Sequence, residues 1–457
     1  MGIPPRTYGA LQARVRESLV TRALVLPVQR FIHIQGISSV FLLAAAIAAL
    51  VWANSPWHDS YHHVWEMELS LARLQLPVHA WINDALMAIF FFLVGMEIKH
   101  EIVHGDLADV RKAALPVFAA LGGIIVPAAI YTAFNYGRPG QHGWGIPMAT
   151  DIAFSLGVLG LAKGVPAELK LFLLTLAIAD DIGAIAVIAI FYSGSLDGGA
   201  LVTGIIILGL IAGLQKLGIS QPILYFVLGV AFWVAVMRSG IHATIAGVIL
   251  GFMVPTTAPL SLEQFQEIAS ETSQQFRTAM SGGDSPTAKN LLGSLEYLVA
   301  NTESAAERLT RTLNDWVSFL VLPLFALANA GVTFSGGVFR QLFTSHVAWG
   351  VFFGLVIGKP LGIVGFAKLS VRSGLAQLPR GVAWRQIAAV GALAGIGFTV
   401  SIFISSLAFD DAVLLTQAKT AILFASLVAG LIGYFSLTSA ALPEPNPEAQ
   451  AIVETQG

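Results

Sequence analysis

The stretch LKLFLLTLAIADDIGAIAVIAIFYS, residues 169–193, places two adjacent aspartates, Asp180 and Asp181, in the middle of an apolar run. A helix that crosses the hydrocarbon core of a bilayer needs about 20 mainly apolar residues, so this stretch predicts a membrane-spanning helix. An ionised side chain in that core costs about 2.5–3.5 kcal/mol, and residues kept there despite this cost usually serve a function. The stretch therefore indicates both the class of the protein and the place of its chemistry.

The composition of the whole chain agrees with a membrane protein. Of its 457 residues, 56% are hydrophobic and 11% are charged, whereas soluble domains carry charged residues at roughly 25%. The 45 glycines and nine tryptophans fit as well, because glycine is frequent in membrane helices and tryptophan gathers at membrane interfaces. The net charge of -2 gives no indication of a nucleic-acid partner, and a chain without cysteine has no disulfides or thiolate chemistry.

Twelve apolar segments are long enough to be candidate spans, so we predict an all-α polytopic membrane protein with about 12 transmembrane helices. Their approximate limits are 36–53, 80–98, 113–134, 145–162, 169–193, 199–215, 221–237, 240–255, 315–333, 347–367, 386–409 and 416–437. The first 35 residues are basic, but no small-residue cleavage site follows the first apolar run. That run is therefore expected to stay as a membrane helix.

Lysine and arginine predict the orientation of these helices, because cytoplasmic loops carry an excess of both. With a cytoplasmic N-terminus, nineteen of the 25 basic residues fall on the cytoplasmic side and four on the outer side. The other two, Lys359 and Lys419, lie inside predicted spans. Both termini are therefore predicted to be cytoplasmic. The expected parts are a cytoplasmic segment at 1–35, a membrane domain at 36–437 with a cytoplasmic insert at 256–313, and a cytoplasmic tail at 438–457.

Two segments outside the membrane have recognisable patterns. Residues 66–76 partly alternate polar and apolar side chains on the outer side, which indicates a β-ribbon able to pair with its copy in a second subunit; an ordinary loop is the alternative. In the insert, apolar residues spaced by three and four predict an amphipathic helix packed on the cytoplasmic face. They are Leu292, Leu295, Val299, Thr302, Ala306, Leu309 and Leu313.

The paired aspartates favour a cation site. Neighbouring residues point about 100° apart on a helix, so Asp180 and Asp181 can face different partners in one cavity. Two close carboxylates cannot both ionise at low cost, and their hard oxygens suit a small, hard cation. The pair therefore predicts exchange of a proton for a small, hard cation, with Lys359 as counter-charge. The structural alternative is that one aspartate caps a helix break and the other forms a permanent ion pair with a lysine.

Glycine and proline interrupt two predicted spans at matching positions. Asp151 follows Pro147 in the fourth span, and Gly395-Ile-Gly-Phe-Thr interrupts the eleventh. These are the middle spans of 3–5 and 10–12, which start on opposite sides and so form an inverted repeat. Interrupted helices in such repeats point to an ion site near the membrane midplane. There, Asp151 would neutralise the N-terminal helix ends and Lys359 the C-terminal ends.

Other ionisable residues give weaker indications. Asp84, near the outer end of the second span, fits a helix cap, and a lone histidine such as His242 is more often a hydrogen-bonded packing residue than a ligand. Lys419, near the start of the last span, can extend to the membrane surface. The cytoplasmic end of the second span carries charges of an ordinary solvated kind: Glu97, Lys99, His100 and Glu101.

Seven motifs, in order along the chain, resemble those of the bacterial NhaA sodium/proton antiporters. They are Trp81-Ile-Asn-Asp-Ala-Leu-Met-Ala, Phe92-Leu-Val-Gly-Met-Glu, Ala149-Thr-Asp-Ile-Ala-Phe, Ala179-Asp-Asp-Ile-Gly-Ala, Ser239-Gly-Ile-His-Ala-Thr, Gly358-Lys-Pro-Leu-Gly and Gly395-Ile-Gly-Phe-Thr. The resemblance runs from about residue 35 to 437. NhaA antiporters are themselves among the inverted-repeat transporters behind the rule on interrupted helices, so the topology argument and the resemblance are not independent.

The resemblance implies twelve spans with crossed, broken fourth and eleventh helices, and a cytoplasmic funnel that leads to the paired aspartates. Asp180 and Asp181 would bind Na+ or Li+, with Asp180 in a salt bridge to Lys359. Asp151 and Thr150 would lie at the helix crossing. These roles are carried over from the family, motif by motif.

The resemblance also implies a secondary active transporter of the bacterial inner membrane that is no enzyme and needs no cofactor. It would exchange more protons than sodium ions per cycle, and the outer ribbon at 66–76 would join two subunits. Glu97 and Glu101 would lie in the funnel and act in the pH response. His100 stands between them in place of the family's usual basic residue and would act in the same response. The start of the ninth span, Arg308-Leu-Thr-Arg-Thr-Leu-Asn-Asp-Trp, lacks the Glu and His frequent in the family, so the resemblance does not fix the pH set-point.

Other functions share some of these features. A proton-coupled transporter of another cation would need the same membrane-embedded aspartates. An intramembrane aspartyl protease would need a Gly-x-Gly-Asp context and a second aspartate on another helix, whereas Ala-Ile-Ala precedes Asp180. A membrane scaffold would leave the buried charges unexplained. The sequence therefore favours a pH-regulated, electrogenic Na+(Li+)/H+ antiporter in which cation and protons compete for Asp180 and Asp181.

Overall fold

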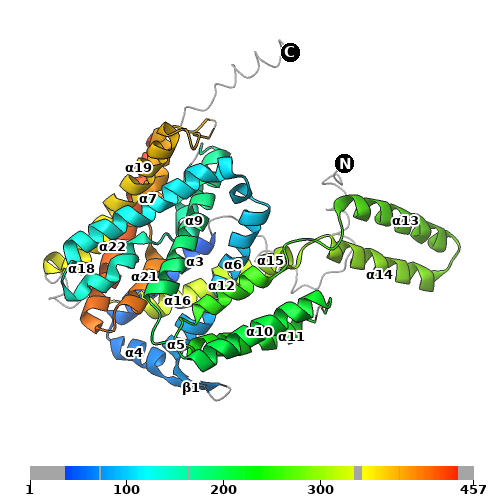
Figure 1. Ribbon diagram of the computed structural model, residues 1–457, viewed down its shortest axis with the longest axis horizontal. Helices are drawn as coiled ribbons and strands as arrows, with labels where there is room; N and C mark the ends of the chain where they lie inside the picture. The colour runs from blue at the N-terminus through cyan, green and yellow to red at the C-terminus, as the bar shows by residue number, and fades with distance from the viewer. Residues whose placement is uncertain are drawn as a thin grey trace, which may run out of the picture.

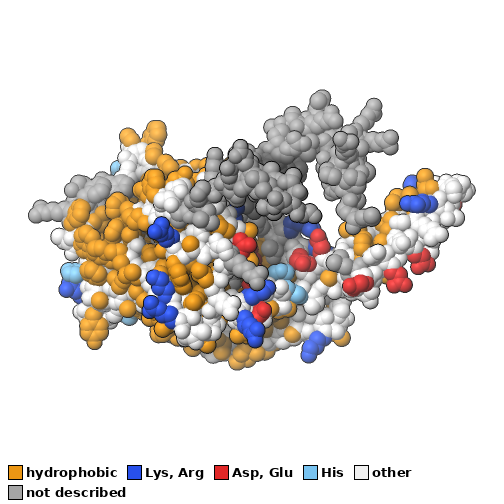
Figure 2. Space-filling model, turned by 90° about the horizontal axis from the view of Figure 1, so that it is seen from above, with side chains coloured by type: hydrophobic (Ala, Val, Ile, Leu, Met, Phe, Trp, Pro, Cys, Tyr) orange, Lys and Arg blue, Asp and Glu red, His pale blue; other side chains and the backbone are white. Residues whose placement is uncertain are grey.

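A computed structural model describes residues 37–71, 74–162, 164–219, 221–333, 342–379 and 381–440. The predicted cytoplasmic segment 1–35 and residues 441–457 of the predicted tail lie outside these residues. The described residues are mainly helical, and the helices form one large bundle from which a helical hairpin projects (Figure 1). Apolar side chains cover much of the bundle surface, as lipid-facing helices require (Figure 2).

Each of the twelve predicted spans coincides with a helical segment. These segments are α3 (Ile37–Ala53); α5 (Val78–Ala80), η2 (Trp81–Leu86) and α6 (Met87–Val103); α7 (Val110–Asn135); η4 (Pro139–Met148) and α8 (Ile152–Leu161); α9 (Ala167–Phe191); α10 (Gly198–Lys216); α11 (Pro222–Arg238); α12 (Thr244–Met253); α15 (Ala305–Trp316), η5 (Val317–Val321) and α16 (Leu322–Asn329); α18 (His346–Phe353), η6 (Gly354–Gly358) and α19 (Lys359–Arg372); α20 (Trp384–Leu393) and α21 (Phe398–Ala408); and α22 (Ala412–Ala440).

Length and composition confirm a multi-pass membrane protein. Within the described part of the chain, seven helices are long and apolar enough to cross a membrane, or up to ten if each sharply bent pair is one span. Helices α11 and α12 are apolar but shorter. The all-α, multi-pass fold class is therefore confirmed, whereas the number twelve stays a prediction.

The fourth and eleventh predicted spans are broken, as expected. The 3-10 helix η4 and α8 meet at 46°, and α20 and α21 meet at 49°. Pro147 lies at the end of η4, and residues 149–151 are extended before α8 begins. In the eleventh span, Gly395 and Gly397 lie in the gap between α20 and α21. Both breaks fall at the predicted positions.

Close backbone contacts organise the helices into two groups. The first, here called the site bundle, contains α7, η4/α8, α9, α18/α19, α20/α21 and α22; the second, the flanking bundle, contains α3, α5/α6, α10, α11, α12 and α15/α16. A Cβ added at Gly122 of α7 would lie 2.1 Å from the carbonyl oxygen of Gly362 in α19, and one at Gly247 of α12 would lie 2.1 Å from that of Ala88 in α6. Such small residues let membrane helices pack backbone against backbone.

The predicted ribbon is present. Strand β1 (Glu68–Leu71) pairs antiparallel with β2 (Leu74–Pro77), with Glu68 opposite Pro77 and Leu71 opposite Leu74. It follows α4 (His58–Glu66), which is bent by 115° from α3, and projects beside α4 in Figure 1. Leu69 is exposed on the ribbon. The alternation of polar and apolar residues thus identified a strand pair correctly.

The insert differs from the prediction. Its helices α13 (Leu262–Ser281) and α14 (Ser285–Asn301) form a hairpin that projects away from the bundle (Figure 1). The predicted amphipathic helix over 292–313 is interrupted after Asn301, because Ser304 starts α15 with a capping box to Glu307. Leu292 and Val299 are 50% and 57% exposed, so the prediction of one continuous helix packed on the cytoplasmic face was wrong.

Candidate functional site at the helix crossing

Asp151 lies where the two broken helices cross. Its Oδ1 accepts a hydrogen bond from the backbone N–H of Phe154 at 3.0 Å and so caps α8. Its Oδ2 accepts from the backbone N–H and the hydroxyl of Thr399, at 3.1 and 2.5 Å, in the first turn of α21. One buried carboxylate therefore faces the N-terminal ends of two helices, where the helix dipoles place partial positive charge.

Hydroxyl groups donate hydrogen bonds to carbonyl oxygens at or near the C-terminal ends of the other two half-helices, α20 and η4. Thr150 Oγ1 donates to the carbonyl oxygen of Ala394 at 2.8 Å, and Ser155 Oγ donates to that of Leu393 at 3.0 Å, both at the end of α20. In return, Ser401 of α21 donates to the carbonyl oxygen of Ile146 in η4 at 2.8 Å. The crossing is thus tied in both directions by buried hydrogen bonds.

Lys359 joins the remaining helix end to the aspartate pair. Its Nζ lies 2.5 Å from Asp180 Oδ2 and also donates to the carbonyl oxygen of Met148, the last residue of η4. Lys359 is 0% exposed and Asp180 is 2% exposed. The Lys359 ammonium therefore faces the charge of the Asp180 carboxylate and the partial negative charge at the C-terminal end of η4.

The aspartate pair has carboxylate oxygens that accept no hydrogen bond from the described residues. The second oxygen of Asp180, Oδ1, is buried and has no hydrogen-bond partner in the described structure. Asp181 is 5% exposed and, among the described residues, accepts no hydrogen bond. Buried polar atoms are nearly always paired, so unpaired carboxylate oxygens in the protein interior indicate a site for a proton or a cation.

The donor set fits a small, hard cation held by few charges. Among the described residues there is no cluster of three or more His, Cys, Asp or Glu side chains arranged to hold a metal ion. A cation at the pair would therefore complete its coordination with hydroxyl, carbonyl or water oxygens.

The C-terminal end of α6 lies near this site. Val94 and Ile98 of α6 pack against Ile178 of α9, and Glu97 between them lies within electrostatic range of Asp181. The two neighbouring residues have local partners instead. Glu101 accepts a hydrogen bond from the backbone N–H of Asp106 at 3.1 Å, and the His100 ring lies 5.3 Å from that of His104.

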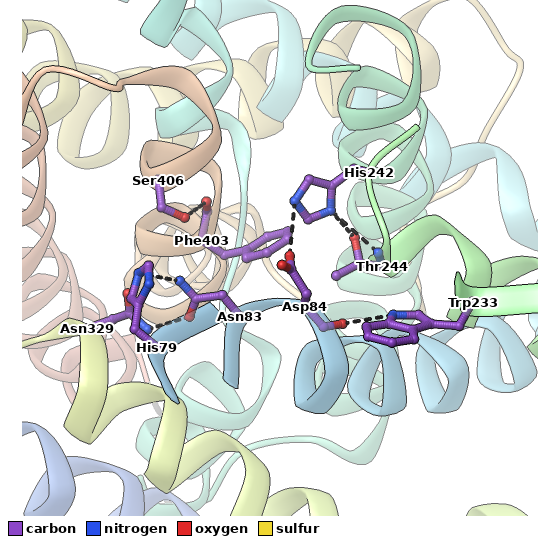
Figure 3. Close-up of polar contacts among 9 residues, drawn as sticks. All are labelled: His79, Asn83, Asp84, Trp233, His242, Thr244, Asn329, Phe403 and Ser406. Atoms are coloured by element: carbon purple, nitrogen blue, oxygen red, sulfur yellow. Dashed lines mark hydrogen bonds and ion pairs between the residues drawn. The ribbon is translucent and has the colours of Figure 1, made fainter. Parts of the chain in front are cut away.

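Asp84 and His242 form a separate polar contact (Figure 3). His242 Nε2 lies 3.8 Å from Asp84 Oδ1, and its Nδ1 lies 2.9 Å from Thr244 Oγ1, while the ring packs edge-on against Phe403 at 5.3 Å. His242 is thus a hydrogen-bonded packing residue. The predicted helix cap at Asp84 was wrong, because Asp84 lies inside the π-helical turn η2 and its carboxylate faces His242.

Sequence reasoning missed three residues of the crossing: Ser155, Thr399 and Ser401. Thr399 lies two residues after Gly397, the second interrupting glycine, so its position was a signal that it would face the broken end. Ser155 and Ser401 gave no such signal, because their partners are 238 and 255 residues away in the sequence.

Comparison with known proteins assigns the family. The family model described as "Na+/H+ antiporter 1" matches residues 29–437. The chain belongs to this family of Na+/H+ antiporters. It is 44% identical over 421 residues to a Na(+)/H(+) antiporter NhaA of Wolinella succinogenes, covering 89% of this chain and 92% of that protein. A second NhaA antiporter, from Cupriavidus necator, is 44% identical over 440 residues, which cover 94% of each chain.

A third relative, the antiporter NhaA 2 of Sorangium cellulosum, is 44% identical over 441 residues, or 94% of this chain and 92% of that one. The resemblance inferred from the seven motifs is therefore confirmed. Members of the Na+/H+ antiporter family are transporters rather than enzymes, so the protease alternative falls away.

Proposed function

We propose that this antiporter exchanges Na+ or Li+ for protons at Asp180 and Asp181. The observation that carries the proposal is the Asp180 carboxylate. One of its oxygens forms an ion pair with Lys359, and the other is buried without a hydrogen-bond partner among the described residues. A cation bound there would be shared with Asp181. Because a protonated carboxyl no longer attracts a cation, protons and Na+ compete, and the loaded site is exposed to each side of the membrane in turn.

The exchange is proposed to be electrogenic. Two carboxylates can take up two protons, whereas together they share one monovalent cation. A cycle that carries two protons in one direction and one Na+ in the other moves net charge, so an outer excess of protons expels Na+ from the cytoplasm. We propose that the protein lies in the bacterial inner membrane with both termini in the cytoplasm, because most of its Lys and Arg residues fall in segments predicted to be cytoplasmic.

The same proposal assigns roles to the surroundings of the site. Glu97, which lies within electrostatic range of Asp181, would transmit the cytoplasmic pH to the site together with Glu101 and His100. Lys359 would hold the Met148 carbonyl while Asp180 exchanges its partners. The exposed ribbon β1–β2 would pair two subunits through its free edge.

The test uses purified protein in liposomes with a dye that reports the proton gradient. Wild-type protein should move protons when Na+ or Li+ is added, and Asp181→Asn should not. Because protons and Na+ compete, the apparent KM for Na+ should rise as the pH is lowered, by about tenfold per pH unit for each competing proton, with an unchanged maximal rate. Robust exchange by Asp181→Asn would refute the site. Proton movement driven equally well by K+ would favour the transporter of another cation.

A further inference from the structure

A second buried polar chain lies apart from the aspartate pair. The Nδ2 amide of Asn83 lies 2.9 Å from Nε2 of His79, and Asn83 Oδ1 accepts a hydrogen bond from Asn329 Nδ2 at 2.8 Å (Figure 3). Asn329 Oδ1 accepts in turn from Lys419 Nζ at 3.4 Å. Both asparagines are buried. We call these four residues the Lys419 clasp.

Lys419 does not behave as the sequence predicts. A lysine near the end of a membrane helix is expected to extend to the membrane surface, yet the half-buried Lys419 side chain donates from its ammonium to the buried side chain of Asn329. Among the described residues, no carboxylate forms an ion pair with it. An ammonium in this setting is costly when only an amide oxygen partners it, so the inward orientation needs a reason.

The clasp crosses the boundary between the two bundles. Lys419 lies on α22, which packs against α18, α20 and α21 of the site bundle, whereas His79, Asn83 and Asn329 belong to the flanking bundle. Elsewhere the described contacts between the bundles run mainly through α3 with α8, α6 with α9, and α16 with α21. The backbone contacts of Gly122 with Gly362 and of Gly247 with Ala88 each lie within one bundle. Where α3 meets α8, the Ser39 hydroxyl donates to the carbonyl oxygen of Ala153 at 2.6 Å.

We propose that the Lys419 clasp holds the site bundle against the flanking bundle, and that it opens in the step that exposes the ion site to the other side of the membrane. This inference rests on the alternate exposure of the Asp180/Asp181 site proposed above. Lys419 is then a positioning residue, since it donates a hydrogen bond to Asn329 and not to the aspartate pair.

The chemistry of the clasp suits a contact that breaks in every cycle. The ammonium is carried on a flexible four-carbon stem with three rotatable donors, so it can exchange partners without moving the helix. When it leaves, Asn329 keeps its Nδ2 contacts with Asn83 and with the carbonyl oxygen of Phe325, the latter at 3.1 Å. One long hydrogen bond is therefore lost, and the buried amide pair stays intact.

Cysteine cross-linking tests the proposal directly, because the natural chain has no cysteine. The pair Asn329→Cys/Lys419→Cys is joined with a short bifunctional methanethiosulfonate in proteoliposomes. Cross-linking should abolish Na+-driven proton movement, and a reductant should restore it. The control pair is Phe41→Cys/Phe319→Cys, whose rings lie 5.5 Å apart within the flanking bundle; its cross-link should leave transport unchanged. Full transport by the cross-linked clasp would overturn the proposal.

A second variant keeps the test decisive if the cysteine pair is inactive before cross-linking. Asn329→Asp keeps the shape of the side chain and turns the hydrogen bond to Lys419 into an ion pair. It also removes the Nδ2 donor to Asn83 and Phe325, a loss that the double variant with Lys419→Gln shares. A clasp that must open should therefore open more slowly in Asn329→Asp than in that double variant. We expect turnover to fall while the apparent KM for Na+ stays near wild type. Adding Lys419→Gln should restore turnover. Equal turnover of Asn329→Asp and wild type would contradict the clasp, whereas failure of the Asp181 assignment would leave these outcomes unaffected.

Discussion

Thr399 donates both its backbone N–H and its hydroxyl to the same oxygen of Asp151, at 3.1 and 2.5 Å. The other Asp151 oxygen caps α8 through Phe154. One carboxylate thus caps the N-terminal ends of two helices, although Asp151 and Thr399 lie 248 residues apart in the sequence. The Asp151 carboxylate therefore links the two broken helices, one from each half of the inverted repeat, at the point where they cross.

Removing that charge should loosen the crossing. In Asp151→Asn the side-chain amide would bring its own N–H donors to a place that already holds three, so both capping interactions weaken. Hydrogen bonds to charged groups contribute about 1.5–3 kcal/mol each, so we expect a clearly lower thermal unfolding transition in detergent. Thr399→Val, which removes only the hydroxyl, is the milder control. An unchanged unfolding temperature in Asp151→Asn would contradict the shared-cap interpretation.

Lys359→Ala should change both transport and stability. Breaking a buried ion pair by removing one partner costs about 3–5 kcal/mol, because Asp180 is left uncompensated. We expect a lower unfolding transition and a shifted pH dependence of Na+-driven proton movement. The double variant Lys359→Met/Asp180→Asn removes both charges and should recover stability without recovering transport. An unchanged pH profile in Lys359→Ala would indicate a passive lysine.

Gly122→Val should disrupt the contact between α7 and α19. A Cβ at Gly122 would lie 2.1 Å from the carbonyl oxygen of Gly362, so the backbones would have to separate. Overpacking costs about 1–3 kcal/mol even where side chains can adjust, and backbone atoms adjust less readily. The matched control is Gly365→Val on α19, where a Cβ would have no neighbour within 4 Å. We expect the yield of monodisperse protein to fall in Gly122→Val alone; equal yields would contradict the close approach.

Deleting the α13–α14 hairpin should leave basal transport intact. The backbone N–H of Leu260 donates to the carbonyl oxygen of Asn301 at 3.1 Å, so a short Gly-Ser linker can replace residues 261–300. The hairpin extends from the bundle with acidic side chains such as Glu263, Glu267 and Glu271 along it (Figure 2). Na+-driven proton movement at saturating Na+ measures the result. A shortened chain that folds but no longer transports would place the hairpin in the ion path.

The helical architecture was predictable because its signal is local. Each span follows from a run of apolar residues, and both breaks follow from glycine and proline, since these residues weaken a helix wherever they occur. The insert was less predictable. Its periodic leucines and valines continue across Thr302, but the capping box of Ser304 and Glu307 starts a new helix there.

The candidate site was predictable in its charges but not in its contacts. Asp151, Asp180, Asp181 and Lys359 stood out because a polar group in an apolar run is visible in the sequence. The hydroxyls of Ser155 and Ser401 did not stand out, because serine is common in membrane helices and its role depends on the helix it faces.

The sequence by itself determined that the chain spans the membrane several times, where two spans break and which charges are embedded, because the cost of a polar group in lipid is a property of its own segment. The family resemblance implied the pairing of Lys359 with Asp180, whereas only the tertiary structure decided the pairings of Asp84 with His242 and of Lys419 with Asn329. These partners lie 179, 158 and 90 residues apart. Which of them meet depends on how helices pack around close glycine contacts, and hydropathy along the chain does not carry that information.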